Sequence, residues 1–244
     1  MAENKWTVNF EIYRQKGQGA PKFETFAMEV RPDEYVIDAV ERIWAFHDRT
    51  LTYRHACHHS TCGACGMRVN GVEKLTCITA IQSITRNGGT VRVEPLRNFP
   101  VVSDLVVDMG KMYTRLEQVG FRTTVPLNEA PPPDSQGIQR DRGASTELER
   151  LVDCIECGMC ISACPVPLTT PDYLGPAVLA GAQHRGLNQS SAQVLALVDS
   201  SDGVWRCHSA YECTAVCPSS VEPAWRIMDL RKQVVKERFK RIYG

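Results

Sequence analysis

The spacing of the cysteines constrains this chain more than any other feature of its sequence. It has eleven cysteines among 244 residues, and the run C-x2-C-x2-C-x3-C-P occurs at Cys154, Cys157, Cys160, Cys164 and Pro165. This run is typical of proteins that hold two iron-sulfur clusters, because its first three cysteines bind one cluster and its fourth crosses over to the other. The pattern therefore requires a second run elsewhere in the chain.

The second run lies closer to the C-terminus and lacks one ligand. Cys207, Cys213, Cys217 and Pro218 keep the same frame, but Ala210 occupies the position of the second cysteine. Crossing over as the motif prescribes gives one cluster four thiolates and the other three. We predict that the first group is Cys154, Cys157, Cys160 and Cys217, and that the second group is Cys164, Cys207 and Cys213.

The unequal numbers of thiolates predict two different clusters. Each iron of a 4Fe-4S cubane is tetrahedral and needs one protein sulfur besides its three sulfides, so four thiolates suit this cluster. Three thiolates leave one corner iron without a protein ligand. We therefore expect a 3Fe-4S cluster at the second site, with Ala210 facing the missing corner.

The remaining four cysteines have the spacing C-x4-C-x2-C followed by a more distant cysteine: Cys57, Cys62, Cys65 and Cys77. This is the plant-type pattern for a 2Fe-2S cluster. Gly63 and Gly66 lie inside the pattern, where a loop around a cluster must turn tightly and bring backbone N–H groups close to sulfur. Four, four and three ligands account for all eleven cysteines.

Disulfides and zinc are the alternatives to iron. An odd number of cysteines argues against a disulfide framework. Structural zinc is the stronger alternative, since C-x2-C pairs are its common sign, but zinc sites use sets of four ligands and these runs do not divide that way. His55, His58 and His59 flank Cys57, yet four cysteines already complete that site, so we interpret these histidines as loop residues rather than ligands.

Composition and charge limit the class of protein. The chain is 43% apolar and 23% charged, as is ordinary for a globular protein, and its formal net charge of zero gives no reason to expect nucleic acid. The apolar runs fall short of the roughly 20 residues that a membrane-spanning helix needs. Residues 1–6 have no apolar signal core, so we expect a reducing compartment, which suits free thiolates.

The N-terminal part predicts a small α+β domain. Alternating apolar residues at 8–12 and 26–30 indicate a β-hairpin, and Asp33 is expected to cap a helix that carries apolar residues at helical spacing: Ile37, Val40, Ile43 and Trp44. After the cysteine loop, residues 67–69 and 72–75 surround Asn70 and Gly71, a strong type I′ turn signal, and residues 91–93 supply a closing strand. This order predicts a plant-type ferredoxin-like (β-grasp) domain over residues 1–105.

The remainder, residues 106–244, is predicted to be an all-helical, bacterial-ferredoxin-like domain. Apolar residues recur at helical spacing from Leu105 to Leu116. The polar stretch 122–146 is interpreted as a surface crossing, after which the helical pattern resumes at Glu147.

The C-terminal tail predicts an amphipathic basic helix. Met228, Val235, Phe239 and Ile242 fall on one helical face, and basic residues outnumber acidic ones between Met228 and Gly244. Such a helix suits an acidic partner or lipid headgroups. The alternative is a helix packed on its own domain with a solvated basic face.

The chain supplies neither a donor nor an acceptor for single electrons. Gly17 and Gly19 are followed by Pro21 without the third glycine of a dinucleotide-binding turn, and no C-x-x-C-H haem motif is present. A flavin or nicotinamide must therefore belong to another subunit.

Together the three motifs, at residues 53–67, 154–165 and 207–218, resemble the iron-sulfur subunit of succinate dehydrogenase and fumarate reductase, over nearly the whole chain. The resemblance implies a flavoprotein subunit with covalently bound FAD that interconverts succinate and fumarate. It also implies that electrons pass through 2Fe-2S, 4Fe-4S and 3Fe-4S clusters to a membrane quinone. Membrane anchor subunits, with or without haem b, and a peripheral place at the cytoplasmic face of a bacterial membrane follow from the same resemblance.

The resemblance also implies a quinone pocket near the 3Fe-4S cluster. The matching positions are Pro165 and His208, where His208 is expected either to contact quinone or a haem propionate, or to donate a hydrogen bond to sulfide. Several ubiquinone-linked members carry tryptophan after that proline, whereas this chain has Val-Pro-Leu168, so menaquinone or a displaced site is an open alternative to ubiquinone. Trp205 is considered either as a wall of this pocket or as a core residue.

Three alternatives to a succinate-oxidising role remain at this level. The subunit could serve a quinol:fumarate reductase, or another flavin-linked respiratory oxidoreductase of the heterodisulfide or glycolate type. A zinc-stapled interaction module is the alternative without redox chemistry.

Overall fold

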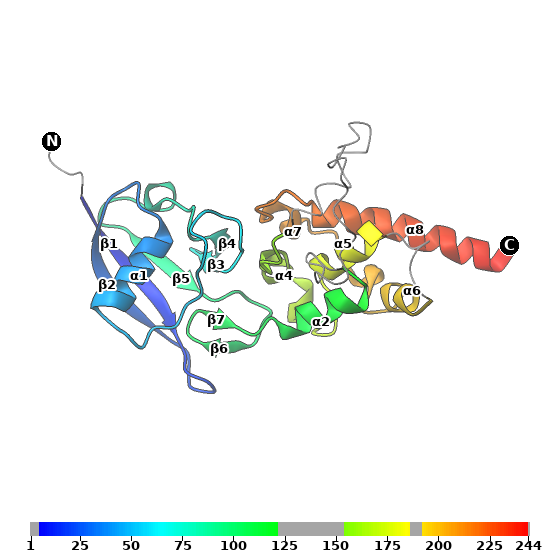
Figure 1. Ribbon diagram of the computed structural model, residues 1–244, viewed down its shortest axis with the longest axis horizontal. Coiled ribbons are helices and arrows are strands. Elements are labelled where there is room, and N and C mark those ends of the chain that lie inside the picture. The colour runs from blue at the N-terminus through cyan, green and yellow to red at the C-terminus, as the bar shows by residue number, and fades with distance from the viewer. Residues whose placement is uncertain (1–4, 122–153, 186–191, 244) are drawn as a thin grey trace, which may run out of the picture.

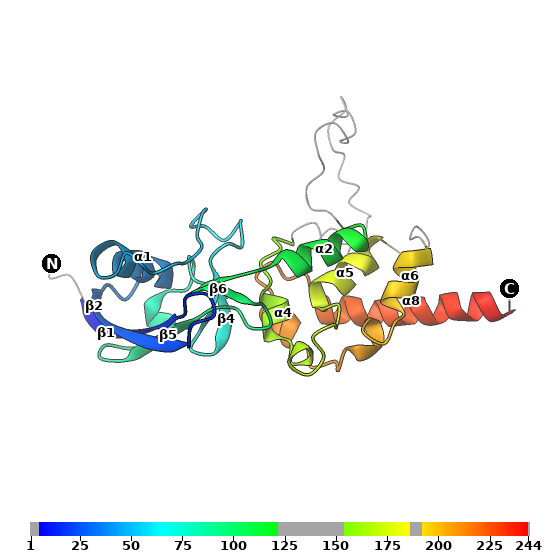
Figure 2. The same ribbon diagram turned by 90° about the horizontal axis from the view of Figure 1, so that it is seen from below.

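The computed structural model describes residues 5–121, 154–185 and 192–243, and places a β-sheet half beside a helical half (Figure 1). The predicted surface crossing at 122–146 and the helical pattern from Glu147 lie outside these residues. The two halves are joined through the hairpin of β6 (Val101–Ser103) and β7 (Val106–Val107), which lies between them in both views (Figures 1 and 2).

The N-terminal half is built on a five-stranded sheet in the order β2-β1-β5-β3-β4. The strands are β1 (Trp6–Arg14), β2 (Lys22–Val30), β3 (Gly66–Val69), β4 (Val72–Leu75) and β5 (Thr90–Glu94). The predicted hairpin of β1 and β2 is confirmed, with Val8, Phe10 and Ile12 wholly buried. Asn70 and Gly71 both have positive φ, as the predicted type I′ turn between β3 and β4 requires. The strand predicted at residues 91–93 is β5, which lies at the centre of the sheet, parallel to β1 and antiparallel to β3.

Helix α1 (Val36–Phe46) lies over one face of this sheet (Figure 2). Its buried side includes Ile37, Val40 and Ile43, as predicted. The predicted cap at Asp33 is wrong, because the helix is capped at Tyr35, whose backbone N–H donates to Asp38 at 3.0 Å. A short 3-10 turn, η1 (Ile81–Ser83), is bonded to the segment that leads into α1, since the Ile81 N–H donates to the Glu34 carbonyl at 2.9 Å.

The helical pattern predicted from Leu105 begins later in the structure. Leu105 lies in the turn between β6 and β7, and α2 runs over Gly110–Gln118 with Met112 and Leu116 buried. The turn is fixed by Asp104, which has a positive φ, is wholly buried, and accepts backbone N–H groups from Gln15 at 3.0 Å and Thr52 at 2.9 Å. The buried Asp104 therefore fixes a turn where the spacing of apolar residues alone predicts a helix. The predicted domain boundary at residue 105 falls inside this turn and stays a prediction.

The C-terminal half is helical, as predicted. Its elements are α4 (Met159–Ala163), η2 (Val166–Leu168), α5 (Pro176–Arg185), α6 (Ala192–Val198), η4 (Val204–Arg206), α7 (Glu212–Ala215) and α8 (Pro223–Tyr243). The core forms where α5 lies along the first half of α8, around Val178, Leu179 and Ile227 (Figure 1). No helix within the described residues is long and apolar enough to span a membrane.

The residues of α8 that pack on its own domain lie one position away from the apolar face that the sequence indicates. Ile227, Leu230 and Val234 are buried, whereas Phe239 and Ile242 are 58% and 68% exposed. The reason is geometric: α5 lies along the first half of α8, and the C-terminal end of α8 extends beyond the other helices (Figure 1). The apolar residues Phe239 and Ile242 at that end therefore remain exposed within the described part of the chain.

Candidate functional site: three groups of cysteines

The first group of cysteines surrounds the loop between α1 and β3. Cys65 and Cys77 are buried at the sheet end, while Cys57 is half-buried and Cys62 is exposed at the loop tip. The loop turns so that the backbone N–H of His59 points at the Cys57 sulfur and that of Ala64 at the Cys62 sulfur, each at 3.5 Å. Such N–H groups stabilise negative charge on sulfur.

The thiols of this group have opposed tendencies to ionise. Hydrogen bonds from the Thr61 side chain and the His59 backbone lower the pKa of Cys57 to about 5. Burial, followed by a hydrogen bond with Cys65, raises the pKa of Cys77 to about 11. Four close sulfurs can all be thiolates only if positive charge compensates them, and ferric iron supplies that charge. The donor set therefore fits a 2Fe-2S cluster.

The second group lines one apolar cavity together with the start of α5 and the segment before α8. Its sulfurs belong to Cys154, Cys157, Cys160 and Cys217. Burial raises the pKa of Cys157 to about 12 and that of Cys160 well above its usual value, and the neighbouring thiols add to both effects. Because the protein alone disfavours thiolates here, the cavity fits a cationic iron-sulfur core that takes the place of the thiol protons.

The third group lines a neighbouring cavity. Cys164, Cys207 and Cys213 face it, and Ala210 lies on the same wall. Burial raises the pKa of Cys213 to about 12. The structure thus brings the predicted three cysteines together with the alanine that replaces a fourth.

Tyr173 also lines this cavity, and no pattern in the sequence indicates that it would. Its side chain is almost completely buried, and its hydroxyl has no hydrogen-bond partner among the described residues. Burial, with the negative charge of Cys207 and Cys164, raises its pKa, so the hydroxyl keeps its proton. A buried O–H group without a partner normally costs free energy, and a cluster sulfur in this cavity would accept its hydrogen bond. No motif spacing marks this residue, and only its burial identifies it.

The first and second groups meet at Gly63. This glycine has φ +70°, and a Cβ placed on it would lie 2.8 Å from the Cys157 Cβ and 2.8 Å from the Ile155 carbonyl oxygen. Only glycine permits this approach, because any side chain would push the two loops apart. The predicted need for glycine here therefore has a specific cause: the loop of the first group lies directly against that of the second.

The contact between the two halves is completed by buried polar groups around α4. The Ser162 hydroxyl donates to Glu73 at 2.7 Å and accepts the Arg97 backbone N–H at 2.8 Å. The Asn98 side-chain amide donates to the carbonyl oxygens of Ile161 at 2.7 Å and Cys164 at 2.9 Å. These bonds fix the helix that carries Cys160 and leads into Cys164.

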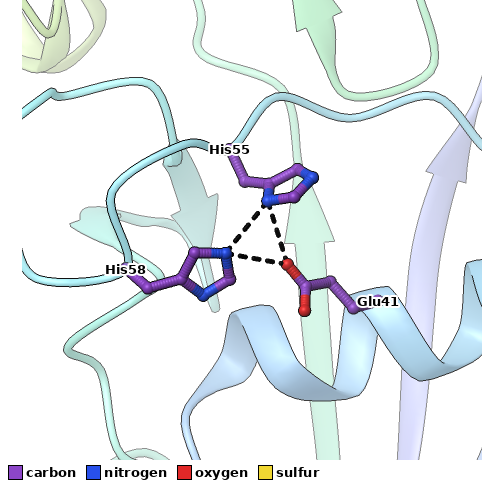
Figure 3. A group of neighbouring side chains, drawn as sticks. All are labelled: Glu41, His55 and His58. Atoms are coloured by element: carbon purple, nitrogen blue, oxygen red, sulfur yellow. Dashed lines mark hydrogen bonds and ion pairs between the residues drawn. The ribbon is translucent and has the colours of Figure 1, made fainter.

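Two of the loop histidines gather beside the first group. His55 Nδ1 and His58 Nε2 lie 3.0 Å and 3.1 Å from Glu41 Oε1 of α1, and 3.0 Å from each other (Figure 3). The sequence placed the histidines in the loop but gave no sign of Glu41, which lies fourteen positions before His55 on a different element.

Comparison with known proteins agrees with this geometry. Residues 9–114 match the family model described as a 2Fe-2S iron-sulfur cluster binding domain, and residues 150–221 match that of a 4Fe-4S dicluster domain. The chain is 33% identical over 233 residues to the fumarate reductase iron-sulfur subunit of Mycobacterium tuberculosis, covering 94% of this chain and 93% of that one. It is 31% identical to the succinate dehydrogenase iron-sulfur subunit of Paracoccus denitrificans, covering 93% and 87%.

The chain belongs to the family of succinate dehydrogenase and fumarate reductase iron-sulfur subunits. A solved structure titled as the Mycobacterium smegmatis Sdh1 complex in the apo form contains a chain of the same fold, with a TM-score of 0.77, 23% identity, and coverage of 96% and 98%. The predicted fold class and the oxidoreductase assignment are confirmed. The 2Fe-2S and 4Fe-4S predictions are also confirmed at the level of the domains, against the zinc alternative.

The family resemblance of the sequence predicts quinone contacts near the third group of cysteines. Pro165 and His208 line the cavity of the third group. Trp205 comes two residues before Cys207 in the chain. Its indole N–H donates to Asp199 at 2.7 Å, and the Arg238 guanidinium lies over its ring, 5.1 Å from the ring centre. Its ring is 39% exposed, so the interpretation of Trp205 as a core residue is wrong.

Proposed function

We propose that this subunit carries single electrons between a FAD-containing flavoprotein subunit, which interconverts succinate and fumarate, and a membrane quinone. The assigned ligands are Cys57, Cys62, Cys65 and Cys77 for 2Fe-2S; Cys154, Cys157, Cys160 and Cys217 for 4Fe-4S; and Cys164, Cys207 and Cys213 for 3Fe-4S. When bound, such clusters accept and donate one electron at a time. The residues of this chain would hold the clusters and set the charge and hydrogen bonding around them.

The proposal rests on how closely the three groups of cysteines follow one another in space. The loop of the first group touches Cys157 of the second group at Gly63. The second and third groups then share α4, which contains Cys160 and is followed at once by Cys164. No long stretch of protein separates one group from the next, which is the arrangement that stepwise electron transfer needs.

The assignment of a 3Fe-4S cluster rests on the chemistry of the third cavity. Three thiols face it, and the Ala210 methyl group takes the place of a fourth. A methyl group cannot hold an iron, so the corner beside Ala210 would carry no protein ligand. The Tyr173 hydroxyl is positioned to donate a hydrogen bond in the same cavity, which stabilises added negative charge and favours the reduced state.

The partners follow from the family. A subunit that holds clusters but no flavin needs a flavoprotein on one side and membrane anchor subunits, with or without haem b, on the other. We place it peripherally, at the cytoplasmic face of a bacterial membrane. The names of the relatives include both fumarate reductase and succinate dehydrogenase, so the proposal covers both directions of the reaction. Pro165 and His208, at the exposed edge of the third cavity, are the proposed quinone contacts, with menaquinone or ubiquinone as the acceptor.

The proposal is tested by low-temperature EPR of the anaerobically purified protein, with iron and acid-labile sulfide measured on the same sample. We expect about nine irons per chain (two, four and three), a 3Fe-4S signal in the oxidised state, and reduced-cluster signals after dithionite. An oxidised sample without the 3Fe signal and with about eight or ten irons contradicts the third assignment. Succinate-dependent quinone reduction by the complex with its partner subunits then tests the direction of electron flow.

A further inference from the structure

Glu41, His55 and His58 form a compact triangle outside the three groups of cysteines. The triangle joins α1 to the loop that contains Cys57 (Figure 3). One carboxylate oxygen and two ring nitrogens lie within 3.0–3.1 Å of one another. We call these three residues the His-Glu triad. The family assignment uses none of them as a ligand.

Hydrogen bonds alone cannot satisfy the His-Glu triad. Each ring nitrogen carries at most one proton. If both nitrogens are protonated, two N–H groups face each other across 3.0 Å; if only one is protonated, it donates to the other nitrogen and not to Glu41. Glu41 Oε1 is also buried from solvent and has no hydrogen-bond partner of acceptable geometry within the described structure. Hydrogen bonding between the two histidines therefore leaves the buried Glu41 oxygen without a donor.

A metal ion resolves all of these contacts at once, because three lone pairs would then point at one cation. The separations indicate its coordination. Metal–ligand distances of about 2.0–2.2 Å give ligand–ligand separations of about 2.8–3.1 Å at right angles and about 3.3–3.6 Å at tetrahedral angles. The observed 3.0–3.1 Å matches three adjacent corners of an octahedron. Two histidines and one carboxylate on one octahedral face are a known arrangement for divalent first-row metals.

The neighbouring residues hold the triad in place and leave it accessible. The His55 ring stacks on Tyr53 with ring centres 5.1 Å apart, and Tyr53 packs edge-on against Trp44 at 6.4 Å. These contacts fix the direction of Nδ1, as outer residues do around established metal sites. A surface hollow lined by Trp44, Tyr53, His55 and Glu41 adjoins the triad, so the remaining coordination positions are open to water.

We propose that Glu41, His55 and His58 bind one six-coordinate divalent transition-metal ion of the Fe²⁺, Co²⁺ or Ni²⁺ type, next to the loop that holds the 2Fe-2S cluster. His58 follows Cys57 directly in the chain, so the bound cation lies close to that cluster. A nearby positive charge favours the reduced, more negative form of a cluster. Metal binding therefore raises the reduction potential of the 2Fe-2S cluster.

The test uses the full-length chain carrying its iron-sulfur clusters, with Co²⁺ as the probe. The protein is dialysed anaerobically against increasing Co²⁺, bound cobalt is measured by metal analysis, and the EPR signal of the reduced 2Fe-2S cluster is recorded. We expect one saturable cobalt per chain, broadening of the 2Fe-2S signal by the adjacent paramagnetic ion, and a higher midpoint potential. Glu41→Gln and His58→Ala should weaken cobalt binding by more than about tenfold.

His59→Ala is the matched control, because His59 lies in the same loop, is exposed, and stands outside the triad. It should bind cobalt as the unaltered protein does. Iron content and the cobalt-free EPR signal are checked in each variant, so loss of the cluster is distinguished from loss of the metal site. The proposal is overturned if the cluster-loaded protein binds no saturable cobalt, or if Glu41→Gln, which lies outside the cluster loop, binds cobalt unchanged. Either result leaves the proposed electron-transfer role intact.

Discussion

Replacing Ala210 with cysteine should convert the third cluster from 3Fe-4S to 4Fe-4S. Ala210 lines the same cavity as Cys164, Cys207 and Cys213, so a thiol at this position faces the corner that lacks a ligand. Ala210 is exposed and, unlike Ser209 and Tyr211 on either side, does not have a positive φ. The larger side chain therefore fits without backbone strain and without displacing a buried neighbour.

The expected change is the gain of one iron atom per chain. The iron content should rise from about nine to about ten per chain, while acid-labile sulfide stays at about ten, because 3Fe-4S and 4Fe-4S clusters both contain four sulfides. The oxidised-state EPR signal of the 3Fe cluster should disappear. The potential of the site should fall, since a fourth thiolate adds negative charge that opposes reduction.

Iron, sulfide and EPR are measured on the same anaerobic samples of the unaltered protein and of Ala210→Cys. Ala210→Ser is the matched control, since it is similar in size to cysteine but offers a hard oxygen instead of a soft thiolate, and it should keep about nine irons. The ligand assignment fails if Ala210→Cys retains the 3Fe signal and the lower iron content while the protein is otherwise fully loaded with clusters.

Three further predictions concern the contacts within and between the cluster sites. Gly63→Ala should lower the free energy of unfolding by about 2–5 kcal/mol, because it strains the left-handed backbone and overlaps with the opposite loop. A lower iron content per chain should reveal this loss. Gly66→Ala is the control and should be nearly neutral, since its new Cβ meets nothing closer than 3.4 Å. Tyr173→Phe should lower the potential of the third cluster in a redox titration without changing iron content, and an unchanged potential would show that the hydroxyl does not reach the cluster. Ser162→Ala should lower the free energy of unfolding by about 2–4 kcal/mol, because it removes the hydrogen bond to Glu73 and leaves the Arg97 backbone N–H without its acceptor. At a fixed scan rate this lowers the apparent unfolding temperature on the order of 10 °C, and a change within error would mean that water replaces the hydroxyl.

The sequence was sufficient to predict those features whose chemistry requires particular residues at fixed positions a few residues apart. The positions of Cys154, Cys157 and Cys160 are dictated by the size of a cluster, and the strand pairs around Asn70 and Gly71 by a turn that needs positive φ at both residues. These constraints act over a few residues, so a linear pattern can express them.

The features that the sequence missed depend on what lies opposite in space. Glu41 joins two loop histidines from a helix, and Tyr173 enters the third cavity without any motif. The buried face of α8 lies one position away from the apolar face indicated by the sequence, since apolar spacing does not say where the neighbouring helix ends. The start of α2 was placed too early because the buried Asp104 fixes a turn where the apolar pattern alone favours a helix.

The position of α4 has a consequence for how the protein is assembled. This five-residue helix contains Cys160, a proposed ligand of one cluster, and ends at Cys164, a proposed ligand of the other. The same helix is held to the sheet half through Ser162. Insertion of either cluster therefore orders the wall of the other cavity, and loss of either one loosens it. The helical half should accordingly mature in a single cooperative step, and partly loaded forms should be rare among purified molecules.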